Sequence, residues 1–189
     1  MEDIVLVGFG GHAKSVADCI ERGNKYRIAG YTDFLDNNSC YKYLGTDEVL
    51  YALFQKGIRN VTICMGYLGK GKKREDIYFL LKEKGFCFPT IIDPSAVVAD
   101  SAEIGEGSFI GKGAIINADA KIGKMCIINT KALIEHECRI GDFSHIAVGA
   151  VLCGQVIVGK AAFVGANATV IQQRKIEERV IVPAGVTVR

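Results

Sequence analysis

Residues 122–146 have the sequence IGKMCIINTKALIEHECRIGDFSHI, in which an isoleucine stands at every sixth position. The same spacing extends in both directions, from residue 92 to residue 182, without a break. Residues 92–187 contain 28 Ile, Leu and Val; an even spread over six phases would place about five in each, but one phase holds 16. Those 16 positions are Ile92, Val98, Ile104, Ile110, Ile116, Ile122, Ile128, Ile134, Ile140, Ile146, Leu152, Val158, Val164, Val170, Ile176 and Val182. A strict repeat of this length predicts a stack of equivalent short units.

Two further positions of each six-residue unit, or hexad, are restricted when the aliphatic residue is counted as the first. The fifth position is Ala, Ser or Cys in 12 of the 16 hexads and Val in three more, with Arg174 as the exception. The second position is Gly six times, at Gly105, Gly111, Gly123, Gly141, Gly159 and Gly165. We expect the first and fifth residues to point inward and the glycines to serve turns with positive φ.

A hexad is long enough for one short strand and one turn of a parallel β-solenoid. Each coil then buries its aliphatic residues only against neighbouring coils, which is why many coils are needed. The alternative, a β-sandwich, has turns every 8–12 residues or so and fits a period of six poorly. Cys126 and Cys138 fall on the small inward position, so we expect them to fill the core rather than to act as nucleophiles.

The first half of the chain has a different pattern, in which apolar strand-like runs alternate with helix-like runs. This alternation predicts a small parallel α/β sheet. We therefore expect two domains, at residues 1–90 and 91–189. The predicted strands are residues 4–7, 27–32, 60–65 and 86–91, and the predicted helices are residues 13–22, 47–56 and 72–84. In the third helix, we expect Ile77, Leu80 and Leu81 to point inward.

Composition excludes several classes of function. The 23 basic and 21 acidic residues give a net charge of +2, which offers no electrostatic case for nucleic acid or an anionic membrane. No stretch approaches the roughly 18 apolar residues of a membrane span. The seven cysteines are widely spaced without a C-x-x-C pair, which argues against disulfides and zinc. Seven free thiols fit a reducing environment, so we expect a cytoplasmic protein. Because Met1-Glu2-Asp3 leads directly into a strand, we also expect no signal peptide.

A glycine-rich segment follows the first predicted strand and opens the first predicted helix. Gly8, Gly10 and Ala13 satisfy the pattern G-x-G-x-x-G/A, and Asp33 lies 20 residues after Ala13. Taken alone, the pattern would indicate NAD. The α/β part, however, has only about 90 residues, roughly half of a dinucleotide-binding fold. The glycines still allow a phosphate to approach a helix N-terminus.

Four segments carry a resemblance to a known family: GFGGHAK at residues 8–14, GYTD at 30–33, IEHEC at 134–138 and HIA at 145–147. The chain resembles the hexapeptide-repeat acyltransferases, whose fold is a left-handed parallel β-helix with three hexads per coil. Within them it is most similar to the bacterial sugar acetyltransferases of glycan, pilin and sialic acid pathways. The resemblance covers essentially the whole chain.

The resemblance implies an enzyme that uses acetyl-CoA as co-substrate and forms a homotrimer with three composite sites. The expected acceptor is the amine of a UDP-4-amino-sugar, held by the N-terminal domain. O-acetylation of a sialic acid or another sugar remains an alternative, because the same base would serve a hydroxyl group. A scaffold that binds a nucleotide sugar without catalysis is a second alternative, against which an intact histidine beside an acid argues. No metal is expected.

His136 and Glu137 are the candidate catalytic residues. His136 is the third residue of its hexad, so its side chain is expected to project outward. A neutral imidazole can remove a proton near pH 7, and an adjacent carboxylate can hold its tautomer. The resemblance assigns His136 as the general base and Glu137 as its orienting partner. The family commonly has His-Asp at this point, whereas this chain has His-Glu.

The resemblance also supplies candidates for donor binding. It places His145 at the acetyl-CoA site, near the thioester or the pantetheine arm. Gly154 lies 18 residues after His136, which is one coil, so we expect it directly above the histidine. Its N–H would then act as an oxyanion donor. Asn129 and Thr130 precede the histidine and are candidates for a substrate contact.

In the N-terminal domain the resemblance places Gly10, Gly11 and His12 near the pyrophosphate or the sugar. Gly8 belongs to the same substrate-binding loop, and Asp33 is expected near the uracil or the ribose. The basic run at residues 70–74 could meet a diphosphate, although a short charged run at a helix start is more often solvated.

Overall fold

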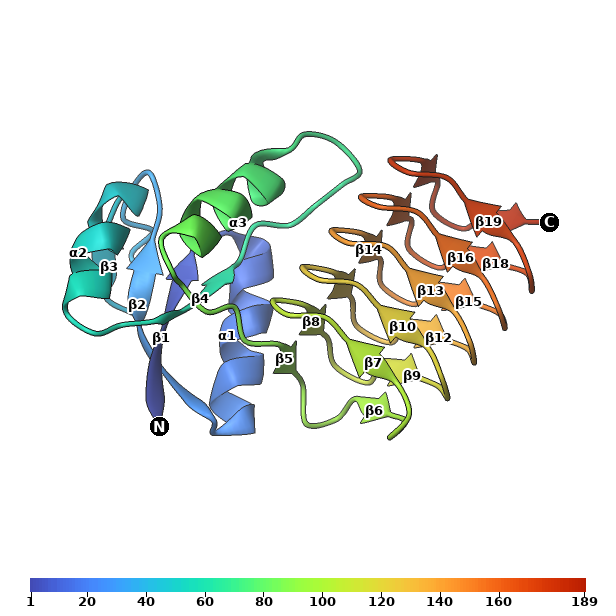
Figure 1. Ribbon diagram of the computed structural model, residues 1–189, viewed down its shortest axis with the longest axis horizontal. Helices are drawn as coiled ribbons and strands as arrows, with labels where there is room; N and C mark the ends of the chain where they lie inside the picture. Colours follow the sequence, from blue (N-terminus) through green and yellow to red (C-terminus); the bar gives the residue numbers. More distant parts are fainter. The chain divides into compact units, whose positions relative to one another are not determined.

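The computed structural model describes all 189 residues and divides them into two compact units. The first unit comprises Met1–Gly66 and Gly71–Pro89, and the second comprises Tyr67–Lys70 and Thr90–Arg189. Figure 1 shows an α/β unit at the N-terminus and a stack of coils that runs to the C-terminus. The sequence places the domain boundary after residue 90, but the short segment 67–70 is grouped with the coils. No helix combines the length and the apolar character needed to cross a bilayer.

The first unit is built on a four-stranded parallel sheet with the order β3-β2-β1-β4. The strand β1 lies inside this sheet, and its residues 4–7 are fully buried, as a continuous apolar run in a parallel sheet predicts. The elements are β1 (Glu2–Val7), α1 (Gly11–Gly23), β2 (Tyr26–Thr32), β3 (Tyr43–Gly45), the 3₁₀ turn η1 (Asp47–Val49), α2 (Leu50–Gln55), β4 (Asn60–Ile63) and α3 (Lys73–Glu83).

Helix α1 follows from the spacing of its apolar residues. Ala13, Val16, Ala17 and Ile20 are buried on one face, as predicted. The helix ends where Asn24 adopts the left-handed conformation and donates its N–H to the carbonyl of Ile20. The helix predicted at residues 47–56 is present as the turn η1 followed by the shorter helix α2.

Two expectations for the first unit are wrong. Residues 86–91 do not form a strand beside β4; Cys87 makes a single bridge to Asn60. The fourth strand is instead β3, a three-residue segment that is too short for an alternating pattern to show. In α3, Leu80 is 53% exposed, and Tyr78 is buried instead. The ring centre of Tyr78 lies 4.8 Å from that of Phe88. The aromatic contact determines which face of α3 turns inward.

The second unit is a left-handed parallel β-helix made of 17 two-residue strands in three sheets of five, six and six strands. Each strand pairs with the strand 18 residues later, as Ile122 does with Ile140, so three hexads make one coil. The strands are β5 (Ile91–Ile92), β6 (Val97–Val98), β7 (Glu103–Ile104), β8 (Phe109–Ile110), β9 (Ile115–Ile116), β10 (Lys121–Ile122), β11 (Ile127–Ile128), β12 (Leu133–Ile134), β13 (Arg139–Ile140), β14 (His145–Ile146), β15 (Val151–Leu152), β16 (Ile157–Val158), β17 (Phe163–Val164), β18 (Thr169–Val170), β19 (Lys175–Ile176), β20 (Ile181–Val182) and β21 (Thr187–Val188).

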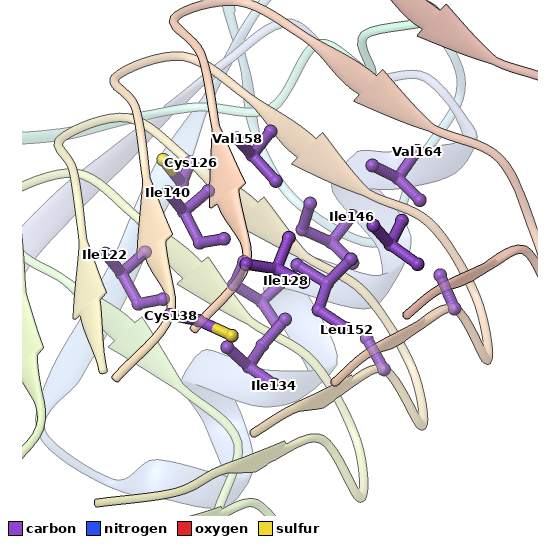
Figure 2. Packing of buried hydrophobic residues seen from close by; sticks show 14 of the residues in the cluster. Ile122, Cys126, Ile128, Ile134, Cys138, Ile140, Ile146, Leu152, Val158 and Val164 are labelled. Carbon is purple, nitrogen blue, oxygen red and sulfur yellow. The ribbon is translucent and has the colours of Figure 1, made fainter. Parts of the chain in front are cut away.

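The first residues of the hexads form the core of the β-helix. Figure 2 shows Ile122, Ile128 and Ile134 of one coil stacked under their equivalents of the next coil. Cys126 and Cys138 are fully buried among them, as predicted. Not every inward residue is buried. Ile92 is 41% exposed, because the first coil has a neighbouring coil on one side only.

The glycines at the second position have a different role from the one expected. Gly105, Gly123, Gly141 and Gly159 do not adopt positive φ. An ideal Cβ added at Gly141 would lie 2.6 Å from the backbone nitrogen of Lys160 in the next coil. The turn between two sheets brings successive coils so close at this corner that no side chain fits. Positive φ occurs instead at the fourth position of the hexads, mostly in residues other than glycine.

Candidate active site

His136 lies in the turn between β12 and β13, and its side chain is 56% exposed. Its Nδ1 lies 3.1 Å from Oε2 of Glu137. An ionised carboxylate can only accept a hydrogen bond, so Nδ1 carries the proton and Nε2 keeps its lone pair. The pair therefore has the arrangement required of a general base, with a free acceptor nitrogen and a fixed tautomer.

Gly154 occupies the equivalent turn position one coil later and lies against the ring of His136. An ideal Cβ on Gly154 would lie 2.6 Å from both Cε1 and Nε2 of the imidazole. The ring thus fills the volume that a side chain at this position would need. The equivalent third positions at Ala118 and Ala166 carry a methyl group, so the turn itself does not require glycine. The Gly154 N–H donates no hydrogen bond within the chain and remains available to a ligand.

Glu137 is held from a second direction. Gln155, one coil later, donates its amide N–H to Oε2 of Glu137 over 3.0 Å. This hydrogen bond, followed by the one from His136, lowers the pKa of the Glu137 carboxyl below its ordinary value. Gln155 is not among the residues predicted from the sequence: the 18-residue spacing places it one coil after Glu137, but only the structure shows the hydrogen bond between them.

His145 is buried, and both of its ring nitrogens are occupied. Nδ1 lies 2.6 Å from the carbonyl oxygen of Tyr67, and Nε2 lies 3.1 Å from the amide nitrogen of Asn129. A carbonyl oxygen only accepts, so His145 is a neutral imidazole whose Nε2 accepts from Asn129. His145 lies in β14, and Asn129 lies in the turn after β11, at a different corner of the coil from His136. One chain therefore does not bring His145 and His136 into the same turn.

Tyr67 belongs to the short segment that packs on the β-helix. Its hydroxyl donates to the carbonyl of Ala161 over 2.7 Å in a buried hydrogen bond. Two residues later, at Gly69, the segment has φ of +80° and passes so close to Phe163 and Ile181 that no side chain would fit there. These contacts could not be predicted from the sequence, because Tyr67 and His145 are 78 residues apart.

The glycine-rich loop borders a cavity of about 540 Å³ in the first unit. An ideal Cβ on Gly10 or Gly11 would meet no atom within 4 Å. Both glycines lie at the start of α1, where unpaired N–H groups and the helix dipole favour an anion such as phosphate. Lys14, one turn further along, adds a positive charge to the wall and is not among the binding residues predicted from the sequence. The remaining wall consists of Phe9, Ala17, Asp18, Asn37, Asn38, Ser39, Cys40 and Tyr41.

Asp33 does not line this cavity, but it accepts a hydrogen bond from Phe9, which does. Its carboxylate accepts hydrogen bonds from the N–H of Phe9 over 2.9 Å and from the N–H of Phe34 over 2.7 Å. Burial raises the pKa of the Asp33 carboxyl, but the hydrogen bonds that it accepts outweigh burial and leave the pKa below its ordinary value. Gly8, with φ of +87°, and the half-buried His12 also lie outside the cavity lining.

The basic run at residues 70–74 does not form one charged surface. The Lys73 ammonium lies 4.4 Å from the centre of the Phe34 ring, whereas Arg74 is buried. No group of three or more His, Cys, Asp and Glu is placed to hold a metal ion. All seven cysteines are free thiols.

Comparison with solved structures decides the family. A perosamine N-acetyltransferase from Caulobacter crescentus, PerB, solved with CoA and GDP-perosamine, is 34% identical in sequence and superposes with a TM-score of 0.93. The match covers 100% of this chain and 89% of that chain. The chain belongs to the hexapeptide-repeat sugar N-acetyltransferases.

Two further matches agree with this family of sugar N-acetyltransferases. Residues 3–79 match the family model described as the PglD N-terminal domain. The acetyltransferase domain of PglB from Neisseria gonorrhoeae is 27% identical, with a TM-score of 0.92, and the match covers 100% of this chain and 92% of that domain. A search of curated proteins finds no match.

Proposed function

We propose that this protein transfers the acetyl group of acetyl-CoA to the amine of a nucleotide-linked amino sugar in bacterial glycan biosynthesis. Membership of the sugar N-acetyltransferase family supports the reaction class. The observation that carries the catalytic assignment is the 3.1 Å contact between His136 and Glu137, with the imidazole packed against Gly154.

In the proposed reaction, the amine nitrogen attacks the thioester carbonyl while Nε2 of His136 takes a proton from it. The new C–N bond forms, the C–S bond breaks, and CoA leaves as the thiol after it receives that proton. Glu137 stabilises the imidazolium that exists between the two proton transfers. The N–H of Gly154, which has no partner within the chain, is our candidate donor to the developing oxyanion.

The acceptor is proposed to bind in the first unit, with its diphosphate at the start of α1. The open space at Gly10 and Gly11 and the charge of Lys14 support this placement. The resemblance favours uridine as the nucleoside, whereas the Caulobacter relative was solved with GDP-perosamine. Both nucleotides therefore have to be tested, and we propose UDP as the starting point.

A homotrimer is the proposed assembly. The outer face of the sheet that contains β6, β9, β12 and β15 carries a row of paired aliphatic side chains, of which Val97 is 63% exposed. The outer face of the sheet that contains β7, β10 and β13 carries Glu103, Lys121 and Arg139 instead. The proposed trimer would have three composite sites, with acetyl-CoA along the outside of the β-helix between two subunits. The row consists of Val97, Ile115, Leu133 and Val151.

The deciding experiment measures thiol release from acetyl-CoA with UDP- and GDP-linked 4-amino sugars, and with sialic acids to test the O-acetylation alternative. We expect turnover only with an amino sugar. We expect His136→Ala to lower kcat by about 10²–10⁴-fold, the usual contribution of a placed base. Because His136 is exposed, the melting temperature of this variant should stay close to that of the wild type. A folded His136→Ala variant with wild-type kcat would place the base elsewhere.

A binding measurement separates the enzyme from a non-catalytic scaffold. Thermal melting with each nucleotide sugar, without acetyl-CoA, reports binding by mass action. A scaffold would show a shift with a nucleotide sugar and no thiol release with any acceptor. NAD is expected to give no shift. Sedimentation at micromolar concentration tests the trimer.

A further inference from the structure

A column of polar side chains rises along the corner of the β-helix that contains His136. Glu137, Gln155 and Gln173 occupy the fourth position of successive coils, and all three have φ near +60°. Gln173 donates its amide N–H to Oε1 of Gln155 over 2.8 Å. Gln155 in turn donates to Oε2 of Glu137 over 3.0 Å. The three side chains therefore form one continuous hydrogen-bonded ladder.

The ladder fixes the orientation of the Gln155 amide, which is bonded at both its nitrogen and its oxygen. The Oε2 atom of Glu137 accepts from both Gln155 and Nδ1 of His136. The side-chain amide of Gln155 could rotate by half a turn and present its oxygen to the carboxylate, which would be repulsive. Gln173 opposes this rotation, because its N–H donates to the Gln155 oxygen and so keeps that oxygen on the side away from Glu137.

We propose that Gln155 is a positioning residue for acetyl transfer, which holds the Glu137 carboxylate against His136, and that Gln173 fixes the orientation of Gln155. This inference rests on the proposed function, since it assumes that His136 is the base. The reason for a second anchor lies in the length of Glu137: a glutamate side chain has one more rotatable bond than an aspartate. In a half-exposed turn, that longer side chain would otherwise spend time away from the imidazole.

Substitution of Gln155 tests the ladder. Ala161 already adopts φ of 51° at the fourth position of its hexad, so alanine is compatible with this turn. We expect Gln155→Ala to lower kcat about tenfold, the effect of losing one hydrogen bond to a charged group. The KM values for both substrates should remain within twofold. Gln173→Ala should have a smaller effect, of about two- to threefold in kcat, because Gln155 can still donate part of the time.

A matched control and a second variant exclude a merely structural effect. Arg179→Ala removes a long polar side chain from the same turn position, with φ of 58°, at another corner, and its kcat should match the wild type. Gln155→Glu keeps the shape but replaces the donor by a second carboxylate. The added negative charge favours the imidazolium, so the acid limb of the kcat/KM profile should move to higher pH. If Gln155→Ala does not fold, Gln155→Met removes the donor at similar length.

A double-mutant cycle shows whether Gln155 acts through Glu137. In a Glu137→Ala background, Gln155→Ala should cause no further loss of kcat, because the group that it positions is absent. An equal loss in both backgrounds, or a wild-type kcat for Gln155→Ala, would overturn the inference. These results differ from failure of the proposed function, in which His136→Ala itself would retain activity.

Discussion

Two sets of glycines, one in the turns of the β-helix and one at the start of α1, have no side chain for opposite reasons. In the β-helix, a Cβ at Gly105, Gly141 or Gly165 would lie 2.5–2.6 Å from the backbone of the next coil. In the α/β unit, a Cβ at Gly10 or Gly11 would meet nothing within 4 Å. The β-helix glycines are thus explained by the chain itself, which closes over them.

Gly10 and Gly11 are not explained by any contact within the chain. Their position at the start of α1, beside a cavity of about 540 Å³ and Lys14, is what a phosphate group needs in order to reach backbone N–H groups. The difference teaches that the same residue type can report on packing in one region and on a ligand in another. Measuring stability and substrate binding separately distinguishes the two.

The largest effect on stability is expected for Gly141→Ala. The added methyl group would meet the backbone of the next coil, which cannot rotate away as a side chain can. We expect a loss of about 3 kcal/mol, typical of overpacking a rigid site, measured by thermal or denaturant unfolding. Gly113→Ala is the control, since its Cβ would meet nothing closer than 3.7 Å. Gly113 has φ of +61°, so its loss reports backbone strain without a close contact. A loss for Gly141→Ala no larger than that for Gly113→Ala would mean that the approach of the coils does not exclude a side chain at Gly141.

Gly11→Ala should have the reverse profile. Alanine is a better helix former than glycine, and the site is open, so the melting temperature should stay the same or rise. The methyl group would stand where we place the diphosphate, and the KM for the nucleotide sugar should rise about tenfold, the equivalent of ~1.4 kcal/mol. Gly23→Ala, at the other end of α1 and equally open, should leave KM unchanged. An unchanged KM in Gly11→Ala would remove the phosphate from this loop.

Tyr67→Phe should affect the second unit more modestly. The variant loses the buried hydrogen bond from the hydroxyl to Ala161 but keeps the carbonyl that accepts from His145. We expect a loss of about 1 kcal/mol in unfolding free energy. Because the partner of Nδ1 is a backbone atom, kcat should change little. A large loss of kcat in the folded variant would show that the hydroxyl group, rather than the carbonyl, positions His145.

The smallest effect concerns the pH dependence of stability through Asp33. Because folding lowers the pKa of this carboxyl, its stabilising contribution is present above the ordinary Asp range, near pH 4, and is lost as the pH falls through the folded value. Asp33→Asn should therefore melt below the wild type at pH 7, and the two curves should converge toward pH 3. A gap that stays constant over this range would show that the charge of Asp33 does not contribute.

The β-helix could be predicted from the sequence because this fold produces a repeat with a period of six residues. Every coil repeats the same environment, so the inward position of Ile134 and the alignment of Gly154 with His136 follow from counting. The α/β unit has no such repeat, and there the expectations for residues 86–91 and for Leu80 were wrong. In that unit, the partner of each residue depends on contacts between segments far apart in the chain.

By itself, the sequence determined the repeat, the core positions and the adjacency of His136 and Glu137, because each depends only on local spacing. Only the tertiary structure decided that His145 donates to Tyr67, that Asp33 binds the loop at Phe9, and that Gln155 supports Glu137. The reason is physical: a hydrogen bond depends on distances of a few tenths of an ångström and on direction. The repeat predicts which coils stack but not how their side chains are oriented, and the path of residues 67–70 follows no repeat, so the sequence does not determine those distances.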